Sequence, residues 1–308
     1  MIRKQTFGKY QEYYLLNPDT SDAIYILPEL GGIVRKIILG KNGNTYEILN
    51  AGDTEALLLS DTAYPSRHLF PFPSRMNQGK YTFEGIDYQL PVNDVSRGHA
   101  IHGFVANQVF EVLETSDLSI RLGFNYTGDY QGFPFPFSFE LTYFLTELGV
   151  ELQYHITNTG TQNFPYGLGW HPYFKLGEEK TDNWEIWFDP KAKIKLNESM
   201  IAEGQEPFEL SDWFDLKGKT LDNAFLIHTS AKPHITTLRS VNQGITLNIW
   251  QDCNHEYLVV YTPPERNRIA IEPLTCNVDA FNNGEGLQVL KAGGTVEMFY
   301  GVSLNLDI

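Results

Sequence analysis

The sequence is poor in cysteine, with only Cys253 and Cys276 among its 308 residues. Two cysteines outside a CxxC arrangement are too few for a disulfide framework, and this scarcity is typical of a reducing compartment. Residues 1–7 lead into polar sequence without the apolar stretch of a secretory signal peptide. No stretch reaches the roughly 18 apolar residues that a membrane-spanning helix needs. We therefore expect a soluble, cytoplasmic protein.

Basic residues are scarce relative to acidic ones. The sequence contains 23 Lys and Arg residues but 38 Asp and Glu residues, which gives a formal net charge of −15. That charge opposes the phosphates of nucleic acid and the headgroups of anionic lipid, and no compact basic stretch offsets it locally. Nucleic acid and membrane surfaces are therefore not expected as partners. The phosphate-binding GxGxxG and Walker loops and the GxSxG nucleophile elbow are missing as well.

Helical periodicity is weak throughout the sequence. Apolar residues seldom recur at the 3.6-residue period beyond one or two turns, so we expect no helix longer than about ten residues. Short runs that alternate apolar and polar residues dominate instead, as in 150–157. This period of two is typical of strands with one buried face. Further strands are predicted at 245–249 and 256–262, and a hairpin that turns near Gly85 is predicted at 80–90.

These patterns extend along the whole chain. No low-complexity linker, charge block or fixed-period repeat divides it, so residues 1–308 are expected to form a single domain. Aromatic residues make up 14% of the sequence, and such side chains favour both sheet surfaces and sugar-binding clefts. The sequence predicts an all-β fold, a large antiparallel β-sandwich with few short helices. Edge strands of such a sandwich can support dimers, which leaves monomer and homodimer both open.

Four short segments concentrate polar residues among glycines, prolines and aromatics. In 70–79, Arg75 stands just before the predicted hairpin, a context that also suits an ordinary surface or ion-pair residue. In 98–104, His99 and His102 lie three residues apart. A metal site would want third and fourth ligands at a recognisable spacing, and neither HExxH nor paired cysteines are present. We therefore expect no metal at these histidines.

The other two segments supply a histidine and a carboxylate. His171 lies in 166–174 among aromatics, two glycines and a proline, a setting that also suits a hydrogen-bonded core histidine. Glu272 follows apolar residues in 268–275, where its carboxylate is costly to bury without a partner or a task, although pairing with an arginine would also explain it. Together the four segments offer an acid, a base and hydroxyl-binding groups. Sugar anomerisation needs that set and no cofactor.

In these segments, and in this order, the sequence resembles the aldose 1-epimerase (galactose mutarotase-like) family, from 26–32 near its start to 296–301 near its end. The resemblance implies a galactose mutarotase-like sandwich of many strands. It also implies an isomerase of carbohydrate metabolism that binds a free aldose such as glucose or galactose. Such an enzyme interconverts the α and β anomers by opening and reclosing the sugar ring, with no cofactor.

The resemblance also implies roles for five residues. Glu272 matches the family's general base, which acts on the C1 hydroxyl, and His171 matches the general acid at the ring oxygen. His102, in a His-Gly motif, would hydrogen-bond the sugar and assist at the reacting end. Arg75 and Asp222 would hold ring hydroxyls. Because Glu272 must be ionised and His171 at least partly protonated, activity is expected to fall on both sides of neutrality.

The sequence departs from the family pattern at several positions. Ser74 replaces the usual Asn, which would alter one substrate contact, and Met76 replaces the usual Ile. Hexose-6-phosphate 1-epimerases of the wider family resemble the chain at His-Gly-Phe, but an Ala-Arg pair that helps bind phosphate follows there, whereas 105–107 reads Val-Ala-Asn. An unphosphorylated sugar is therefore favoured. The alternatives are a hexose-6-phosphate 1-epimerase, a non-catalytic carbohydrate-binding protein of the same fold, or a polysaccharide lyase, which usually carries an added helical domain.

Overall fold

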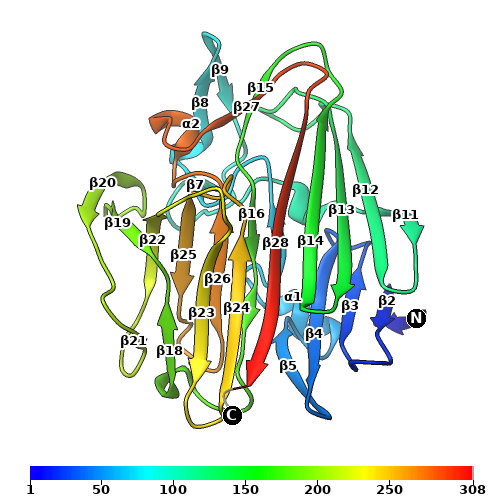
Figure 1. Cartoon of the computed structure of the whole chain (residues 1–308). Helices are drawn as coiled ribbons and strands as arrows, with labels where there is room; N and C mark the ends of the chain where they lie inside the picture. The colour runs from blue at the N-terminus through cyan, green and yellow to red at the C-terminus, as the bar shows by residue number, and fades with distance from the viewer. Residues whose placement is uncertain (307–308) are drawn as a thin grey trace.

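The computed structural model of the protein describes residues 1–306, so the last two residues of the predicted domain 1–308 lie outside the described residues. Two large antiparallel sheets, of 13 and 9 strands, pack face to face (Figure 1). Within residues 1–306, α-helix is limited to α1 (Glu55–Ser60) and α2 (Ala280–Asn283). The prediction of an all-β antiparallel sandwich with few short helices is confirmed. No helix in this part of the chain is long and apolar enough to cross a bilayer.

The first sheet is formed mainly by the N-terminal strands and by strands from the last third of the chain. From one edge to the other it contains β1 (Ile2–Phe7), β2 (Tyr10–Leu16), β3 (Ala23–Leu27), β4 (Ile33–Lys41), β5 (Asn44–Asn50), β17 (Tyr173–Phe174), β26 (Ile269–Leu274), β25 (Tyr257–Tyr261), β22 (Asp222–Ile227), β19 (Pro190–Leu196) and β20 (Ala202–Pro207). Two further short strands extend from β26, where β16 (Gly169–His171) pairs with β26 and β6 (Arg67–Leu69) pairs with β16.

The second sheet combines strands from the middle of the chain with the C-terminal strand. Its order is β11 (Glu111–Thr115), β12 (Ser119–Tyr126), β13 (Phe137–Thr146), β14 (Gly149–Asn158), β28 (Thr295–Leu306), β24 (Ile245–Gln251), β23 (His234–Ser240), β18 (Trp184–Trp187) and β21 (Phe214–Asp215). Three small pairs complete the strands, namely β7 (Arg75–Met76) with β10 (Ala100–Ile101), β8 (Lys80–Phe83) with β9 (Ile86–Gln89), and β15 (Phe164–Tyr166) with β27 (Gln288–Leu290). Three single 3₁₀ turns lie at η1 (Asn77–Gly79), η2 (Val105–Asn107) and η3 (Thr181–Asn183).

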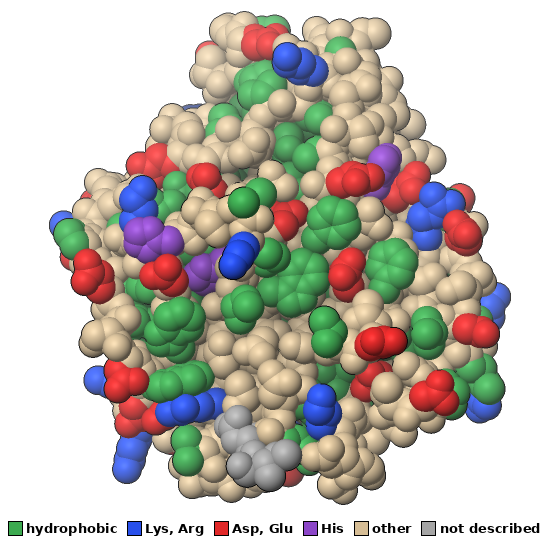
Figure 2. Space-filling view, viewed as in Figure 1, with side chains coloured by type: hydrophobic (Ala, Val, Ile, Leu, Met, Phe, Trp, Pro, Cys, Tyr) green, Lys and Arg blue, Asp and Glu red, His purple; other side chains and the backbone are tan. Residues whose placement is uncertain are grey.

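The predicted strands are confirmed at each place where the alternation is clear. In β14 the residues at even positions from 150 to 156 are buried and their neighbours are partly exposed, as a period of two requires. The predicted strands at 245–249 and 256–262 correspond to β24 and β25, and the hairpin at 80–90 corresponds to β8 and β9. Figure 2 shows scattered hydrophobic and charged side chains on one face of the molecule.

One buried hydrogen-bond network joins the two sheets across the core. The ring of His68, on β6, lies 2.6 Å from the hydroxyl of Tyr154 and 2.8 Å from that of Tyr143, both on the second sheet. The Tyr143 hydroxyl donates to the carbonyl of Gly32, so it accepts from His68 Nε2, and Tyr154 donates to Nδ1. Burial lowers the pKa of His68 to about 3 and keeps the ring neutral. The network therefore fixes the sheet carrying β16 and β26 against its partner.

Candidate active site

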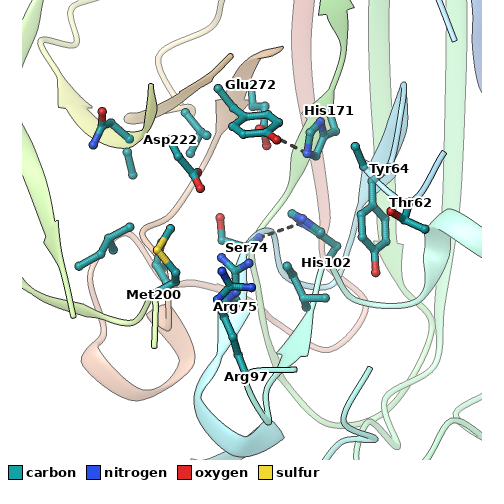
Figure 3. Close-up of a pocket in the computed structure, with 18 of the residues that line it drawn as sticks. Thr62, Tyr64, Ser74, Arg75, Arg97, His102, His171, Met200, Asp222 and Glu272 are labelled. Carbon is teal, nitrogen blue, oxygen red and sulfur yellow. Dashed lines mark hydrogen bonds and ion pairs between the residues drawn. The ribbon is translucent and has the colours of Figure 1, made fainter. Parts of the chain in front are cut away.

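A cavity of about 360 Å³ is hollowed into the first sheet and the loops above it. All five residues that the sequence singled out line this cavity (Figure 3), and they are Arg75, His102, His171, Asp222 and Glu272. They come from β7, the loop after β10, β16, β22 and β26. Side chains that are up to 197 positions apart in the sequence thus face one hollow whose size suits a small ligand.

His171 and Glu272 face each other because their strands pair. β16 and β26 are antiparallel with Gly169 opposite Leu274, and stepping two residues along that register brings His171 opposite Glu272. The atoms His171 Nε2 and Glu272 Oε1 are 3.4 Å apart, and the two side chains are only 8% and 4% exposed. The strand pairing therefore places an imidazole beside a carboxylate, with both side chains largely buried.

The electrostatics of this pair differ from what the sequence suggested. Burial raises the pKa of Glu272 well above its usual value, and the charge of Asp222 adds to that effect while Arg75 opposes it. Burial lowers the pKa of His171 to about 3. Each side chain is thus driven toward its neutral form, so the favoured state of the pair carries one proton, on Glu272. Moving that proton to His171 gives the ion pair.

The backbone of Ser74 orients His102. The amide of Ser74 donates to His102 Nδ1 at 3.2 Å, and the amide of His102 donates to the Ser74 carbonyl at 3.0 Å. Because Nδ1 accepts this bond, Nε2 carries the proton of the neutral ring. Burial lowers the pKa of His102 well below its usual value, and the neighbouring His171 adds to this effect. His102 therefore serves as a fixed neutral donor, and Ser74 acts here through its main chain.

Arg75 and Asp222 lie on the side of the cavity away from Tyr64 (Figure 3). The Nε atom of Arg75 donates to Asp94 at 2.8 Å, which fixes the guanidinium. Asp222 begins β22, opposite Tyr261 of β25, and burial raises its pKa while the charges of Arg75 and Arg97 lower it. The two side chains thus offer a held cation and a carboxylate, the groups that bind hydroxyls.

Several residues that line or support the cavity were missed by the sequence analysis. The ring of Tyr173 stacks on that of His171 with centroids 5.2 Å apart, and the guanidinium of Arg268 lies 4.2 Å from the Tyr173 centroid. Arg268 is paired with Asp61 at 2.7 Å. Nδ1 of His171 has no hydrogen-bond partner from another described residue, so the ring is held by this stacking together with the Nε2 contact to Glu272. Tyr173 lies inside the segment 166–174 that the sequence singled out, but no local pattern predicted that its ring would stack on His171.

Four of the lining residues adopt a backbone conformation that side chains disfavour. Tyr64 and Ser74 each have φ of 56°, and His102 and Met200 each have φ of 63°. These values lie in the left-handed region, where a residue with a Cβ is strained by about 1–3 kcal/mol. The surrounding packing must hold them there, and such strain is typical of functional sites.

Gly103 provides a test of that packing. A Cβ added there would lie 2.1 Å from the carbonyl oxygen of Phe70, whereas one added at Gly98 meets no atom within 4 Å. Both glycines have positive φ, 64° and 74°. We expect Gly98→Ala to cost about 1 kcal/mol of unfolding free energy from backbone strain alone, and Gly103→Ala about 3 kcal/mol or more. Urea unfolding of the two variants measures this difference, and equal losses would contradict the close approach.

Comparisons with known proteins give the same picture of the fold. A galactose mutarotase-like protein from Clostridium acetobutylicum superposes with a TM-score of 0.88 over 99% of this chain and 98% of its own, at 17% identity. A galactose 1-epimerase from Lactobacillus acidophilus NCFM superposes with a TM-score of 0.82 over 100% and 99% of the two chains, at 15% identity. At these identities the likeness concerns the fold.

Comparisons of the sequence, rather than of the structure, identify the family. The Escherichia coli K12 protein YihR, which is described as uncharacterized, is 26% identical over 246 residues, or 78% of this chain and 79% of YihR. A family model described as aldose 1-epimerase matches residues 21–302. Since that match spans nearly the whole chain and includes every residue of the cavity discussed above, the protein belongs to the aldose 1-epimerase family.

Proposed function

We propose that the protein is an aldose 1-epimerase that interconverts the α and β anomers of a free aldose such as glucose or galactose, and that residues 1–308 work as one domain. The observation that carries this proposal is the buried contact of 3.4 Å between His171 Nε2 and Glu272 Oε1 at the wall of a cavity of about 360 Å³. A base and an acid held side by side can act on two adjacent oxygens of one sugar.

The chemistry uses the one proton that the pair holds. In the reactive form Glu272 is ionised and His171 is protonated. Glu272 takes the proton of the C1 hydroxyl while His171 gives its proton to the ring oxygen, so the C1–O5 bond breaks and a C1 carbonyl forms. The pair then consists of protonated Glu272 and neutral His171, the form that burial favours. Rotation about C1–C2 and the reverse proton transfers close the ring as the other anomer.

The remaining side chains bind and orient the sugar in this proposal. His102 donates from Nε2 near the reacting end, because Ser74 occupies its Nδ1. Arg75, held by Asp94, and Asp222 bind ring hydroxyls. None of these three groups needs to exchange a proton with the substrate. Their contribution is to keep the sugar in one pose during opening and reclosure.

Polarimetry or NMR of freshly dissolved α-glucose and α-galactose tests the activity directly. Purified protein should accelerate the approach to anomeric equilibrium well above the buffer rate. Glucose 6-phosphate belongs in the same experiment, because much faster turnover of the phosphate than of glucose would assign the site to a phosphorylated sugar instead. If the protein bound these sugars but accelerated the mutarotation of none of them, a non-catalytic carbohydrate-binding protein would be favoured.

The pH dependence follows from the pKa directions of the pair. Because the pKa of His171 is lowered to about 3, the pair does not take up a second proton above that pH, so we expect no acid limb between about pH 4 and the raised pKa of Glu272. Activity should decline at higher pH, once the raised pKa of Glu272 is passed and the last proton leaves. Initial rates corrected for buffer, measured from about pH 4 to 10, test this. An acid limb near pH 6.5 would contradict it, since His171 would then titrate at its usual value.

A further inference from the structure

A second cavity adjoins the candidate active site. It has a volume of about 600 Å³, within the range of roughly 300–1,000 Å³ that is common for small-ligand sites. Thr62 and Tyr173 line both cavities, so they form the boundary between them. The rest of its wall comes from the loop after β5, the end of α1, the loop after β17 and the loop before β26, and it includes Asn50, Asp53, Ser60, Lys175, Glu178 and Asn267.

The proposed chemistry fixes which edge of the sugar faces this second cavity. In a pyranose, C1 is bonded to O5 on one side and to C2 on the other. With Glu272 at the C1 hydroxyl and His171 at O5, the C2 hydroxyl lies on the side away from His171, where Figure 3 shows Asp222. C5 and its C6 hydroxyl follow O5 and lie on the opposite side, toward Thr62 and Tyr64, which Figure 3 shows beyond His171. The C6 hydroxyl is therefore the position nearest the second cavity.

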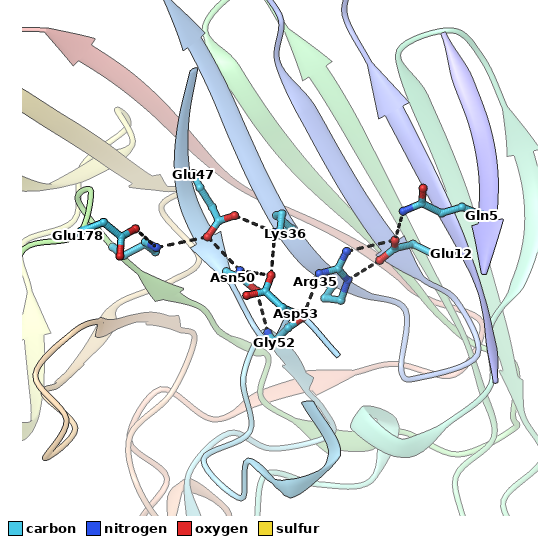
Figure 4. Close-up of polar contacts among 10 residues, drawn as sticks. Gln5, Glu12, Arg35, Lys36, Glu47, Asn50, Gly52, Asp53 and Glu178 are labelled. Carbon is cyan, nitrogen blue, oxygen red and sulfur yellow. Dashed lines mark hydrogen bonds and ion pairs between the residues drawn. The ribbon is translucent and has the colours of Figure 1, made fainter. Parts of the chain in front are cut away.

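The charges around the second cavity favour a neutral occupant. Lys36 is bound by Glu47 and Asp53, and Lys175 by Glu47 and Glu178 (Figure 4). Of these two lysines only Lys175 lines the cavity, and the second lining cation, Arg268, is paired with Asp61 and lies over Tyr173. The lining cations among the described residues are thus already neutralised, and acidic side chains outnumber basic ones in the wall. A phosphate at O6 would meet net negative charge there, whereas hydroxyl groups find carboxylate, amide and hydroxyl partners.

We propose that the second cavity is a subsite for a second sugar unit that is joined through O6 of the aldose in the active site. The inference rests on the proposed function, because the orientation of the sugar follows from the roles of Glu272 and His171. The substrate class then includes 1→6-linked disaccharides with a free reducing end. The reducing unit occupies the cavity of His171 and Glu272, and the linked unit passes Thr62 into the space beside Ser60 and Asn267.

The test compares mutarotation of glucose, of its 6-O-glucosyl derivative isomaltose, and of its 4-O-glucosyl derivative maltose. We expect kcat/KM for isomaltose to lie within about tenfold of that for glucose. Turnover of glucose with no acceleration of isomaltose would overturn this inference alone. Failure with all three sugars would overturn the proposed function, and the inference with it.

Two tryptophan variants locate the effect. Ser60 lies at the end of α1, is exposed and lines only the second cavity of the two, so Ser60→Trp should fill that space. It should lower kcat/KM for isomaltose at least tenfold while glucose and maltose are unchanged, which also shows that the variant is folded. The neighbouring Leu59 is 44% exposed and lines neither cavity, so Leu59→Trp is the matched control and should affect no sugar selectively. Isomaltose turnover that is unchanged by Ser60→Trp would contradict the subsite.

Discussion

Replacing Glu272 by glutamine is expected to lower kcat by about 10³- to 10⁴-fold while sugar affinity stays within about tenfold. Glutamine keeps the shape of the side chain and can still hydrogen-bond the C1 hydroxyl, but it cannot take the proton. The site is buried and the other carboxylate of the cavity lining, Asp222, lies on another strand, so we expect no neighbour to replace the lost base. Polarimetry measures kcat, and titration with galactose measures the affinity for the sugar, so the two effects are obtained separately.

Asp222→Asn is the matched control, because it removes the other carboxylate of the same cavity. Asp222 is proposed to bind a hydroxyl on the C2 side, so its loss should raise KM more than it lowers kcat. Urea unfolding of both variants checks that the fold is retained. If Asp222→Asn abolished turnover and Glu272→Gln left it intact, the two carboxylates would have exchanged roles.

The second large effect is expected for His171→Gln, with kcat lower by about 10²- to 10⁴-fold. The amide of glutamine can approach the ring oxygen, but it has no proton to give. The pH profile should also change shape. In the parent protein activity falls at alkaline pH, when the shared proton leaves. In the variant only Glu272 titrates, so the residual activity should rise with pH through the raised pKa of Glu272 and then stay level.

His155→Gln provides the control for this experiment. His155 lies on the exposed face of β14, beside Glu297 at 3.1 Å, and is not among the residues that line the cavity. Its replacement should change neither kcat nor the pH profile. A His171→Gln profile that kept the alkaline decline would show that the proton lost there belongs to another group, and the proposed acid would have to be sought at His102.

The fold could be predicted because its signal is local. A strand with one buried face alternates along the chain, and β14 and β24 each show this in a few consecutive residues. β25 is instead a short apolar run that ends at Pro263 and Pro264. Which strands become neighbours is a different matter. The order of the first sheet places β5 beside β17 and β17 beside β26, and no alternation of polarity encodes such distant pairing. The architecture was therefore accessible from pattern, and the strand order was not.

The same distinction applies to the site. His171 and Glu272 stood out because each lies among glycines, prolines or apolar residues where a polar group is unusual. The partners that support them carried no such signal, since Asp94, Tyr173 and Arg268 look like ordinary loop and strand residues. Their importance comes from contacts made across the fold. The pKa directions were equally out of reach, because burial is a property of the folded chain.

The four left-handed residues around the cavity have a consequence for any attempt to improve this protein. Glycine adopts their conformation without strain, so replacing Tyr64, Ser74, His102 or Met200 by glycine removes about 1 kcal/mol or more of backbone penalty at each position. Relief of that strain is offset by the entropy that glycine loses on folding and by the side-chain contacts removed, such as those of Tyr64 with His102 and of His102 with His171. A selection for heat resistance alone would favour glycine wherever the relieved strain is the larger of these effects, and it would remove lining side chains of the cavity, so screening here must score turnover and melting together.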